Sequence, residues 1–227
     1  MAKQTEKKIE FNLVIDFDST IVKVETLDII AQLSSNNNII QKIKNITNDA
    51  MEGRLGFQEA LNKRIKILNI SKNDIDLSTK IINKSITNSF LKNKRFLKEN
   101  CDNCYIVSGG FKEIIDPIAT NLGFKKNNVF ANTFNFKNNI VDSIDKNNFL
   151  SNNKGKVKIL KNYININKKD SIIIGDGYTD YEIKKYNEAK YFVQFIENIN
   201  RESLNSKADL IASNFNEIIE FVKLKNE

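Results

Sequence analysis

The chain has 227 residues, with 35 Lys and Arg residues against 28 Asp and Glu residues, so its formal net charge is +7. This length is enough to bury a substantial core, and it fits one domain with a modest insertion. Histidine is absent, which excludes catalytic triads, metal sites and proton shuttles that depend on imidazole. Any proton transfer therefore depends on carboxylates.

The positive charge is spread among asparagine and isoleucine residues, and no dense basic tract alternates with aromatic residues. We therefore expect no nucleic-acid partner, an expectation that tight, saturable binding to a defined nucleic acid would overturn. The first eight residues are charged and unlike a signal peptide, and no apolar run is long enough to span a membrane. These features predict a cytoplasmic protein, and they leave open whether it is a monomer or a homodimer.

Short apolar runs rich in Ile, Val and aromatic residues alternate along the chain with segments that have helical spacing. The apolar runs predict strands at residues 11–15, 105–107, 171–174, 191–195 and 210–212. The segments between them predict helices at residues 111–122, 156–163, 180–186 and 215–224. This alternation is typical of an α/β fold, and it predicts a Rossmann-like core with a parallel sheet.

Between the first two predicted strands, residues 22–89 show helical periodicity and no convincing strand. We expect them to form a helical domain inserted into a core that consists of residues 1–21 and 90–227. In residues 57–68 the apolar side chains recur at near-fourfold spacing, which predicts an amphipathic helix with one buried face. Those apolar residues are Phe57, Leu61, Ile65 and Leu68. Arg64 lies along the same face.

A second, smaller insertion is predicted at residues 130–144. Two extended segments, around residues 134–136 and 140–141, flank Lys137-Asn138-Asn139, which is prone to form a turn. This pattern predicts a β-hairpin.

Two carboxylates and two hydroxyls follow the first predicted strand, in Asp16-Phe17-Asp18-Ser19-Thr20. Ligands of an open parallel sheet bind beyond the carboxyl ends of its strands, so this position suggests phosphoryl chemistry. One aspartate would be the nucleophile and the other the acid and base. The alternative is an ordinary exit from a strand into a turn, because Asp and Ser are common turn residues.

The second predicted strand leads into Ser108-Gly109-Gly110 and then a helix. The Ser108 hydroxyl can donate a hydrogen bond to a phosphoryl oxygen, and glycines let backbone N–H groups approach the same anion. A glycine-rich turn in which Ser108 only caps the helix is the alternative.

A lysine and a second acidic loop follow later in the chain. Lys154, at the start of a predicted helix, could neutralise charge on a transferred group, although a solvated surface lysine is the alternative in so lysine-rich a chain. Asp176 and Asp180 follow another buried strand. Because magnesium prefers hard oxygen ligands, Asp176, Asp16 and the backbone carbonyl of Asp18 make a plausible Mg²⁺ site. Asp180 would hold a metal-bound water or orient Lys154, and an acidic loop that caps the next helix is the alternative.

The two cysteines, Cys101 and Cys104, form a single C-x-x-C motif. A structural zinc site would need a second pair of ligands, so we interpret them as two thiols at a helix-to-strand junction.

Together, these motifs resemble the haloacid dehalogenase superfamily of phosphohydrolases, and the resemblance covers almost the whole chain. Within that superfamily the sequence is most similar to the phosphoserine phosphatase family, and the helical insertion becomes that family's cap. The matching segments are D-x-D-x-T at 16–20, residues 50–53 with Phe57 and Arg64, V-S-G-G-F at 107–111, V-F-A-N at 129–132, K-G-K-V at 154–157 and G-D-G-x-x-D at 175–180.

The resemblance implies a reaction in two steps. Asp16 attacks the phosphorus in line and forms an aspartyl-phosphate while Asp18 protonates the leaving serine oxygen, and Asp18 then activates the water that completes hydrolysis. Mg²⁺ would offset repulsion between the nucleophile and the phosphate dianion. The groups implied to hold the phosphoryl oxygens or the substrate are Ser108, Gly109, Gly110, Lys154 and Thr179.

The resemblance also implies that cap residues choose the substrate. Glu25 would pair with the ammonium group of L-phosphoserine and Arg64 with its carboxylate, while Met51 and Phe57 would shield it from water. Ordinary core packing is the alternative for Met51 and Phe57, and an arginine that only extends to solvent is the alternative for Arg64.

The expected activity is hydrolysis of L-phosphoserine in the last step of serine biosynthesis. Two residues depart from the family pattern: Tyr178 and Glu52 stand where relatives commonly have small residues. The alternatives are a phosphatase or phosphotransferase acting on another small amino-acid phosphate, such as phosphohomoserine, and a non-catalytic binding protein that keeps the fold.

Overall fold

The computed structural model describes residues 9–33, 36–165 and 170–226, and its centre is a six-stranded sheet in the order β3-β2-β1-β6-β7-β8. Every neighbouring pair of strands in this sheet is parallel, as predicted for an α/β fold. The strands are β1 Asn12–Ile15, β2 Cys104–Phe111, β3 Val129–Asn132, β6 Ser171–Gly175, β7 Tyr191–Phe195 and β8 Leu210–Ala212.

Helices cover both faces of the sheet, because alternate side chains of each strand pack into two separate apolar clusters. In β1, for example, Val14 packs into the smaller cluster with α8 and α9, whereas Leu13 and Ile15 pack into the larger one. The core helices are α5 Asn88–Lys92, α6 Lys94–Glu99, α7 Lys112–Leu122, α8 Gly155–Ile159, α9 Tyr178–Lys185 and α10 Phe215–Lys225. Short helical turns lie at Phe17–Ile21, Lys126–Asn128, Phe149–Ser151, Leu160–Ile164 and Glu202–Lys207.

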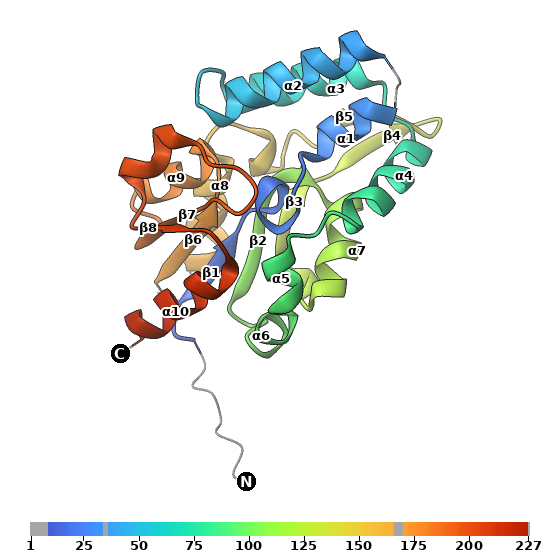
Figure 1. Cartoon of the computed structure of the whole chain (residues 1–227). Coiled ribbons are helices and arrows are strands. Elements are labelled where there is room, and N and C mark those ends of the chain that lie inside the picture. The colour runs from blue at the N-terminus through green and yellow to red at the C-terminus, as the bar shows by residue number, and fades with distance from the viewer. Residues whose placement is uncertain (1–8, 34–35, 166–169, 227) are drawn as a thin grey trace.

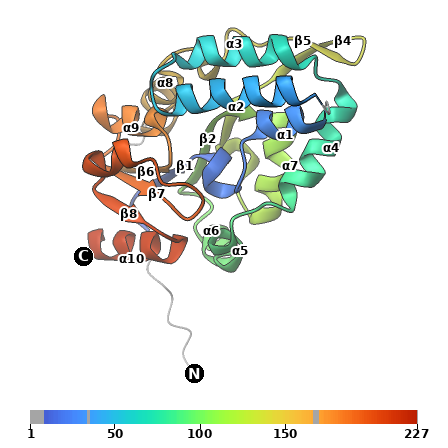
Figure 2. The same cartoon turned by 45° about the horizontal axis from the view of Figure 1, so that its top comes forward.

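Four of the helices between β1 and β2 pack on one another; the first three lie over the carboxyl edge of the sheet, and the fourth also packs on α7 (Figures 1 and 2). They are α1 Thr26–Leu33, α2 Asn37–Met51, α3 Phe57–Leu68 and α4 Lys72–Asn83. We call these four helices the cap. Helix α3 begins and ends where the apolar spacing predicted, whereas the division into domains at residues 22 and 89 stays a prediction.

The predicted hairpin is present as β4 Phe134–Lys137 and β5 Ile140–Ile144, which pair antiparallel. Asn138 and Asn139 form its turn with left-handed φ angles of 51° and 63°. The predicted start at residue 130 was wrong, because residues 129–132 form edge strand β3 of the main sheet. The hairpin also contacts the cap, since Val141 N–H donates to the Ile70 carbonyl at 2.8 Å.

Two further boundaries differ from the prediction. Strand β2 does not end at residue 107 but continues through the glycine pair to Phe111, and α9 begins two residues early at Tyr178. Among the described residues, no helix has the length and apolar character needed to span a membrane.

Candidate active site

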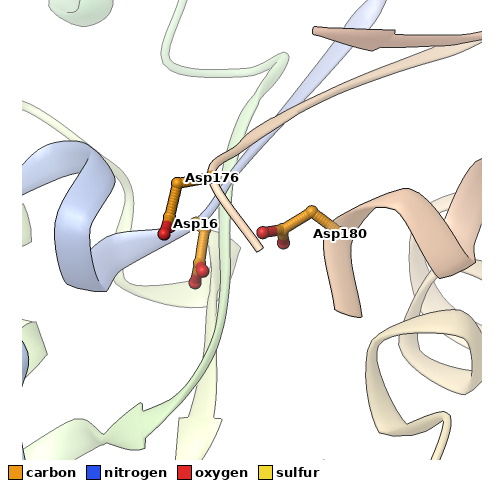
Figure 3. A group of neighbouring side chains, drawn as sticks. All are labelled: Asp16, Asp176 and Asp180. Carbon is orange, nitrogen blue, oxygen red and sulfur yellow. The ribbon is translucent and has the colours of Figure 1, made fainter. Parts of the chain in front are cut away.

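Three aspartates meet at the carboxyl edge of the sheet (Figure 3). Asp16 follows β1 and Asp176 follows β6, and these strands are neighbours, so their ends bring the two carboxylates together. Asp180 reaches the same point from the first turn of α9. Carboxylate oxygens of the three residues lie within 4.8 Å of one another, and all three residues are buried.

Glycines make this close approach possible. A side chain at Gly175 would overlap with the Asp180 carboxyl group, so the strand must end in a residue without a Cβ. The backbone N–H of Gly177 then donates to Asp180 Oδ2 at 3.1 Å and fixes the orientation of that carboxylate.

The lysine that contacts this cluster is Lys156 and not Lys154, whose predicted role in charge neutralisation stays a prediction. Lys156 Nζ lies 2.8 Å from Asp16 Oδ1 and 2.7 Å from Asp180 Oδ1, and the residue is buried. Burial alone would lower the pKa of Lys156, but the two carboxylates raise it.

Lys154 precedes α8 with a left-handed φ of 59° and is exposed, with its Nζ 4.3 Å from the centre of the Tyr186 ring. Lys156, by contrast, lies inside the first turn of α8 and is the one of these two lysines that contacts the aspartates.

Arg201 is a buried cation of the site that the sequence analysis left out. Its Nε lies 2.9 Å from Asp176 Oδ2, and its Nη2 lies 3.9 Å from Glu25 Oε1. It stands in a polar loop without periodicity. The available signal was its position a few residues after the predicted strand at 191–195, whose end lies on the same sheet edge.

The charges of the site do not balance when every group is ionised, because five carboxylates surround three cations. The carboxylates are Asp16, Asp18, Glu25, Asp176 and Asp180, and the cations are Arg64, Lys156 and Arg201. Burial, together with the nearby carboxylates, raises the pKa of Asp176 to about 7. A divalent cation would remove the excess negative charge, and buried carboxylate oxygens are suitable ligands for it. The residues present therefore fit a metal ion.

Asp18 lies beside Asp16 in a different environment. Thr26 Oγ1 donates to Asp18 Oδ1 at 2.5 Å, which leaves Oδ2 for other partners. Burial, assisted by the charge of Asp16, raises the pKa of Asp18 to about 7. A carboxyl group of this kind can exchange a proton near neutral pH.

A narrow cavity of about 30 Å³ lies between the sheet edge and the cap, and most of the predicted site residues line it. From the core these are Asp16, Asp18, Ser108, Gly109, Gly110 and Thr179, and from the cap side Glu25, Met51, Phe57 and Arg64. Lys156 also lines it, whereas Lys154 and Glu182 line an adjacent hollow, which shares Phe57, Gly109, Lys156 and Thr179 with the cavity.

The predicted phosphate-binding segment forms one wall of the cavity. Ser108 Oγ accepts a hydrogen bond from Gly110 N–H at 3.0 Å. Asn132 Nδ2 donates to the Gly109 carbonyl at 2.9 Å and holds this part of β2 in place. The Phe57 ring covers the wall, since a Cβ on Gly109 would lie 2.5 Å from Phe57 Cζ.

Glu25 stands on the cap side of the cavity. Ser19 Oγ donates to Glu25 Oε1 at 2.6 Å. Burial, with the charge of Asp18 next in importance, raises the pKa of Glu25 to about 8. A cationic group in the cavity would therefore find a carboxylate whose charge is poorly compensated.

Arg64 is a buried cation on the same side of the cavity. It is 5% exposed, and its side chain donates to two neutral oxygens, the Ala60 carbonyl and Thr47 Oγ1, both at 3.3 Å. Burial lowers the pKa of Arg64. Within the described part of the chain, no carboxylate lies within 4 Å of its guanidinium nitrogens. A buried cation without an ion pair is a strong site for an anionic group of a ligand.

The two residues that depart from the family pattern lie outside the cavity. The Tyr178 ring packs against Gly53 of the cap, and Tyr178 Oη accepts a hydrogen bond from Lys185 Nζ at 3.3 Å. Glu52 is exposed and forms an ion pair with Arg54. Neither residue displaces a group of the acidic cluster.

Comparison with known proteins agrees with this geometry. The family of haloacid dehalogenase-like hydrolases matches residues 12–183, which contain the sheet edge and the cap. The resemblance expected from the motifs is therefore confirmed at the level of the family.

Curated relatives and a solved structure narrow the family further. The chain is 32% identical to phosphoserine phosphatase of Campylobacter jejuni subsp. doylei, over 87% of this chain and 91% of the relative. It is 30% identical to phosphoserine phosphatase of Methanocaldococcus jannaschii, over 96% of this chain and 100% of the relative. A phosphoserine phosphatase solved as a phospho-aspartyl intermediate analogue superposes with a TM-score of 0.78 at 27% identity, covering 95% of this chain and 99% of that one. The chain belongs to the haloacid dehalogenase-like hydrolases and, within them, to the phosphoserine phosphatase family.

Proposed function

We propose that the chain hydrolyses O-phospho-L-serine to L-serine and phosphate through an aspartyl-phosphate on Asp16, as the last step of serine biosynthesis. The observation that carries the proposal is one cavity that holds Asp16, Asp18 and the unpaired, buried Arg64 together. The first two residues supply the chemistry of phosphate transfer. The third supplies a charge that a simple phosphate ester would not need.

In the first step Asp16 attacks the phosphorus atom. Asp16 Oδ1 already accepts hydrogen bonds from Phe17 N–H at 2.7 Å and from Lys156 at 2.8 Å, so Oδ2 is the oxygen that attacks. The bond between phosphorus and the serine oxygen breaks, and Asp18 Oδ2 gives its proton to that oxygen. Thr26 holds the other oxygen of Asp18 and so keeps Oδ2 directed into the cavity.

In the second step Asp18, now ionised, takes a proton from water, and the water oxygen attacks the phosphorus. The bond to Asp16 breaks and the carboxylate is restored. Lys156 stays between Asp16 and Asp180 throughout and compensates negative charge as it moves onto the phosphoryl oxygens. Ser108 Oγ and the backbone around Gly109 would donate to the same oxygens.

Mg²⁺ is the metal ion that we propose for the acidic cluster. It would be held by Asp16, Asp176 and the Asp18 carbonyl, with Asp180 assisting, and when bound it offsets repulsion between Asp16 and the phosphate dianion. Arg201 keeps Asp176 oriented from its other side.

For substrate choice, Arg64 would bind the carboxylate of phosphoserine and Glu25 its ammonium group. A guanidinium forms paired hydrogen bonds to a carboxylate, which a neutral side chain cannot replace. Phe57 and Met51 would close the cavity over the small substrate.

Phosphate release from four esters tests the proposal: L-phosphoserine, phosphohomoserine, phosphothreonine and phosphoethanolamine, each with and without Mg²⁺. We expect Mg²⁺-dependent turnover that favours phosphoserine. Phosphoethanolamine lacks the carboxylate, so Arg64→Met should reduce kcat/KM for phosphoserine about 100-fold and change that for phosphoethanolamine little. A preference for phosphohomoserine would support the same reaction on a different substrate. Absence of Mg²⁺-dependent turnover of every ester would favour a non-catalytic binding protein.

A further inference from the structure

A row of three polar side chains crosses the cap and ends at the cavity. Asp28 lies on α1, Thr47 on α2 and Arg64 on α3. Thr47 Oγ1 donates to Asp28 Oδ1 at 2.9 Å, and Arg64 Nη1 donates to Thr47 Oγ1 at 3.3 Å. Thr47 is 1% exposed, so water does not compete for its hydroxyl.

The order of donors in this row is fixed by chemistry. A hydroxyl has one hydrogen, and an ionised carboxylate can only accept, so the Thr47 hydrogen points to Asp28. Its lone pairs then face Arg64, which can only donate. Without Asp28, the Thr47 hydroxyl would be free to rotate its hydrogen toward the guanidinium.

Arg64 needs such support because its long side chain must be held for one task. An arginine side chain has many rotamers, and a ligand contact would otherwise have to overcome the entropy lost when they are restricted. Nε donates to the Ala60 carbonyl and Nη1 to Thr47, which leaves the donors of Nη2 for a ligand. Both supporting partners are uncharged, so they orient the guanidinium without neutralising it.

We propose that Thr47 and Asp28 are positioning residues that hold Arg64 ready for the substrate carboxylate, and thereby set the preference for amino-acid phosphates. This inference rests on the proposed function, and neither Thr47 nor Asp28 lines the cavity. Thr47 and Asp28 therefore act through Arg64, and they do not take part in the phosphoryl chemistry at the sheet edge.

The test compares Thr47→Val with wild type on phosphoserine and phosphoethanolamine. A hydrogen bond to a charged group is worth about 1.5 kcal/mol, so KM for phosphoserine should rise about 10-fold while kcat stays within about 2-fold. Kinetics with phosphoethanolamine should stay within about 2-fold, because that ester has no carboxylate for Arg64. Thr47→Ser should restore the wild-type KM, and Asp28→Asn should give a smaller rise.

Thr79→Val is the matched control, since Thr79 is a partly buried cap residue whose hydroxyl, among the described residues, bonds only the Ile75 carbonyl. It should leave the ratio between the two esters unchanged. Equal losses on both esters in Thr47→Val, or the same loss in Thr79→Val, would show a merely structural role and overturn the inference.

Arg64→Met separates this inference from the proposed function. If it abolishes the preference for phosphoserine while Thr47→Val leaves the preference intact, the inference fails and the proposed function stands. If Arg64→Met leaves the preference intact, the role of Arg64 fails and the inference fails with it. In the double variant Thr47→Val, Arg64→Met, the first substitution should have no further effect on the ratio.

Discussion

The core half and the cap half of the site hold their charges in different ways. In the core half, every charged group of the acidic cluster contacts an opposite charge, as Lys156 does between Asp16 and Asp180. In the cap half, Arg64 is held by neutral oxygens and keeps its charge unpaired. The first arrangement pairs charges within the protein before any substrate binds, whereas the second is completed by an anion.

This difference suggests a division of labour. The core half stands on the ends of parallel strands, which are rigid and buried, and rigid placement is what a phosphoryl transfer needs. The cap half stands on helices that pack on the core through a shared apolar cluster, with α4 against α7, and through the hairpin and a few polar contacts. Changes in the core half should therefore reduce turnover on every ester, and changes in the cap half should alter affinity and preference.

The largest effect is expected from Asp16→Asn. The amide is a poor nucleophile, and it loses the charge that Lys156 faces, so kcat should fall on the order of 10⁴-fold for every phosphate ester. Phosphate release measured over hours on phosphoserine and phosphoethanolamine checks this. Selective loss on only one of the two esters would contradict the division between the halves.

The two lysines at the start of α8 give a sharper comparison within the core half. Lys156→Ala removes both ion pairs at the aspartates, so kcat should fall about 100- to 1,000-fold. Lys154→Ala, two residues away and exposed, should leave kcat within about 2-fold. A large loss in Lys154→Ala with normal activity in Lys156→Ala would reverse the assignment made from the structure.

Metal binding should be detectable in a thermal melt, without any measurement of turnover. Because the site carries excess negative charge, Mg²⁺ at 100 times its Kd should stabilise the fold by about 2.7 kcal/mol. For a chain of this size, that raises Tm by roughly 5–10 °C in a thermal melt. Asp176→Asn should remove most of the shift, whereas Asp142→Asn on the exposed side of the hairpin should keep it. An unchanged shift in Asp176→Asn would place the ion elsewhere.

The parts of the fold that the sequence predicted are those with strong local patterns. The strand at 191–195 and the helix at 57–68 were located because a short buried run and a fourfold apolar spacing are visible without tertiary contacts. Strand β3 was assigned to the hairpin, because its four residues have no alternation and only pairing with β2 makes them a strand.

The sequence predicted those site residues that directly follow a strand. Asp16 and Asp176 follow buried runs, and the parallel sheet brings their carboxylates together. The choice between Lys154 and Lys156 depends on where α8 begins, because Lys154 precedes the helix with a left-handed φ whereas Lys156 lies inside it. Arg201 contacts the site residues Asp176 and Glu25, and Thr47 contacts Arg64, across segments that are distant in the sequence, and no local pattern encodes such contacts.

The smallest effect is expected where the cap contacts the core beside α8. Gly56 stands at the amino end of α3 and has no side chain to cap it. Asn153, from the core loop before α8, accepts from Gln58 N–H at 3.1 Å and caps the helix in its place. Asn152 accepts a second hydrogen bond from Gln58 Nε2 at 2.9 Å. A residue of the core thus accepts the hydrogen bond from a free N–H group at the start of a cap helix, and this requires contact between the two halves.

Asn153→Ala should therefore weaken the contact between cap and core without touching the chemistry. A helix cap is worth about 1 kcal/mol, so KM for phosphoserine should rise roughly 5-fold, with KM for phosphoethanolamine rising by the same factor, because the cap covers the cavity for both esters. Gly56→Ser in the same chain gives α3 its own cap, which removes the orphan N–H but not the lost contact between the halves. If the serine restores helix stability in a thermal melt but KM stays high, the contact between Asn153 and the cap itself matters for KM. If the serine restores both helix stability and the wild-type KM, Asn153 matters only to the helix. A change in the preference between esters would instead assign Asn153 to the selective half, and the boundary between the two halves would then lie in the loop before α8.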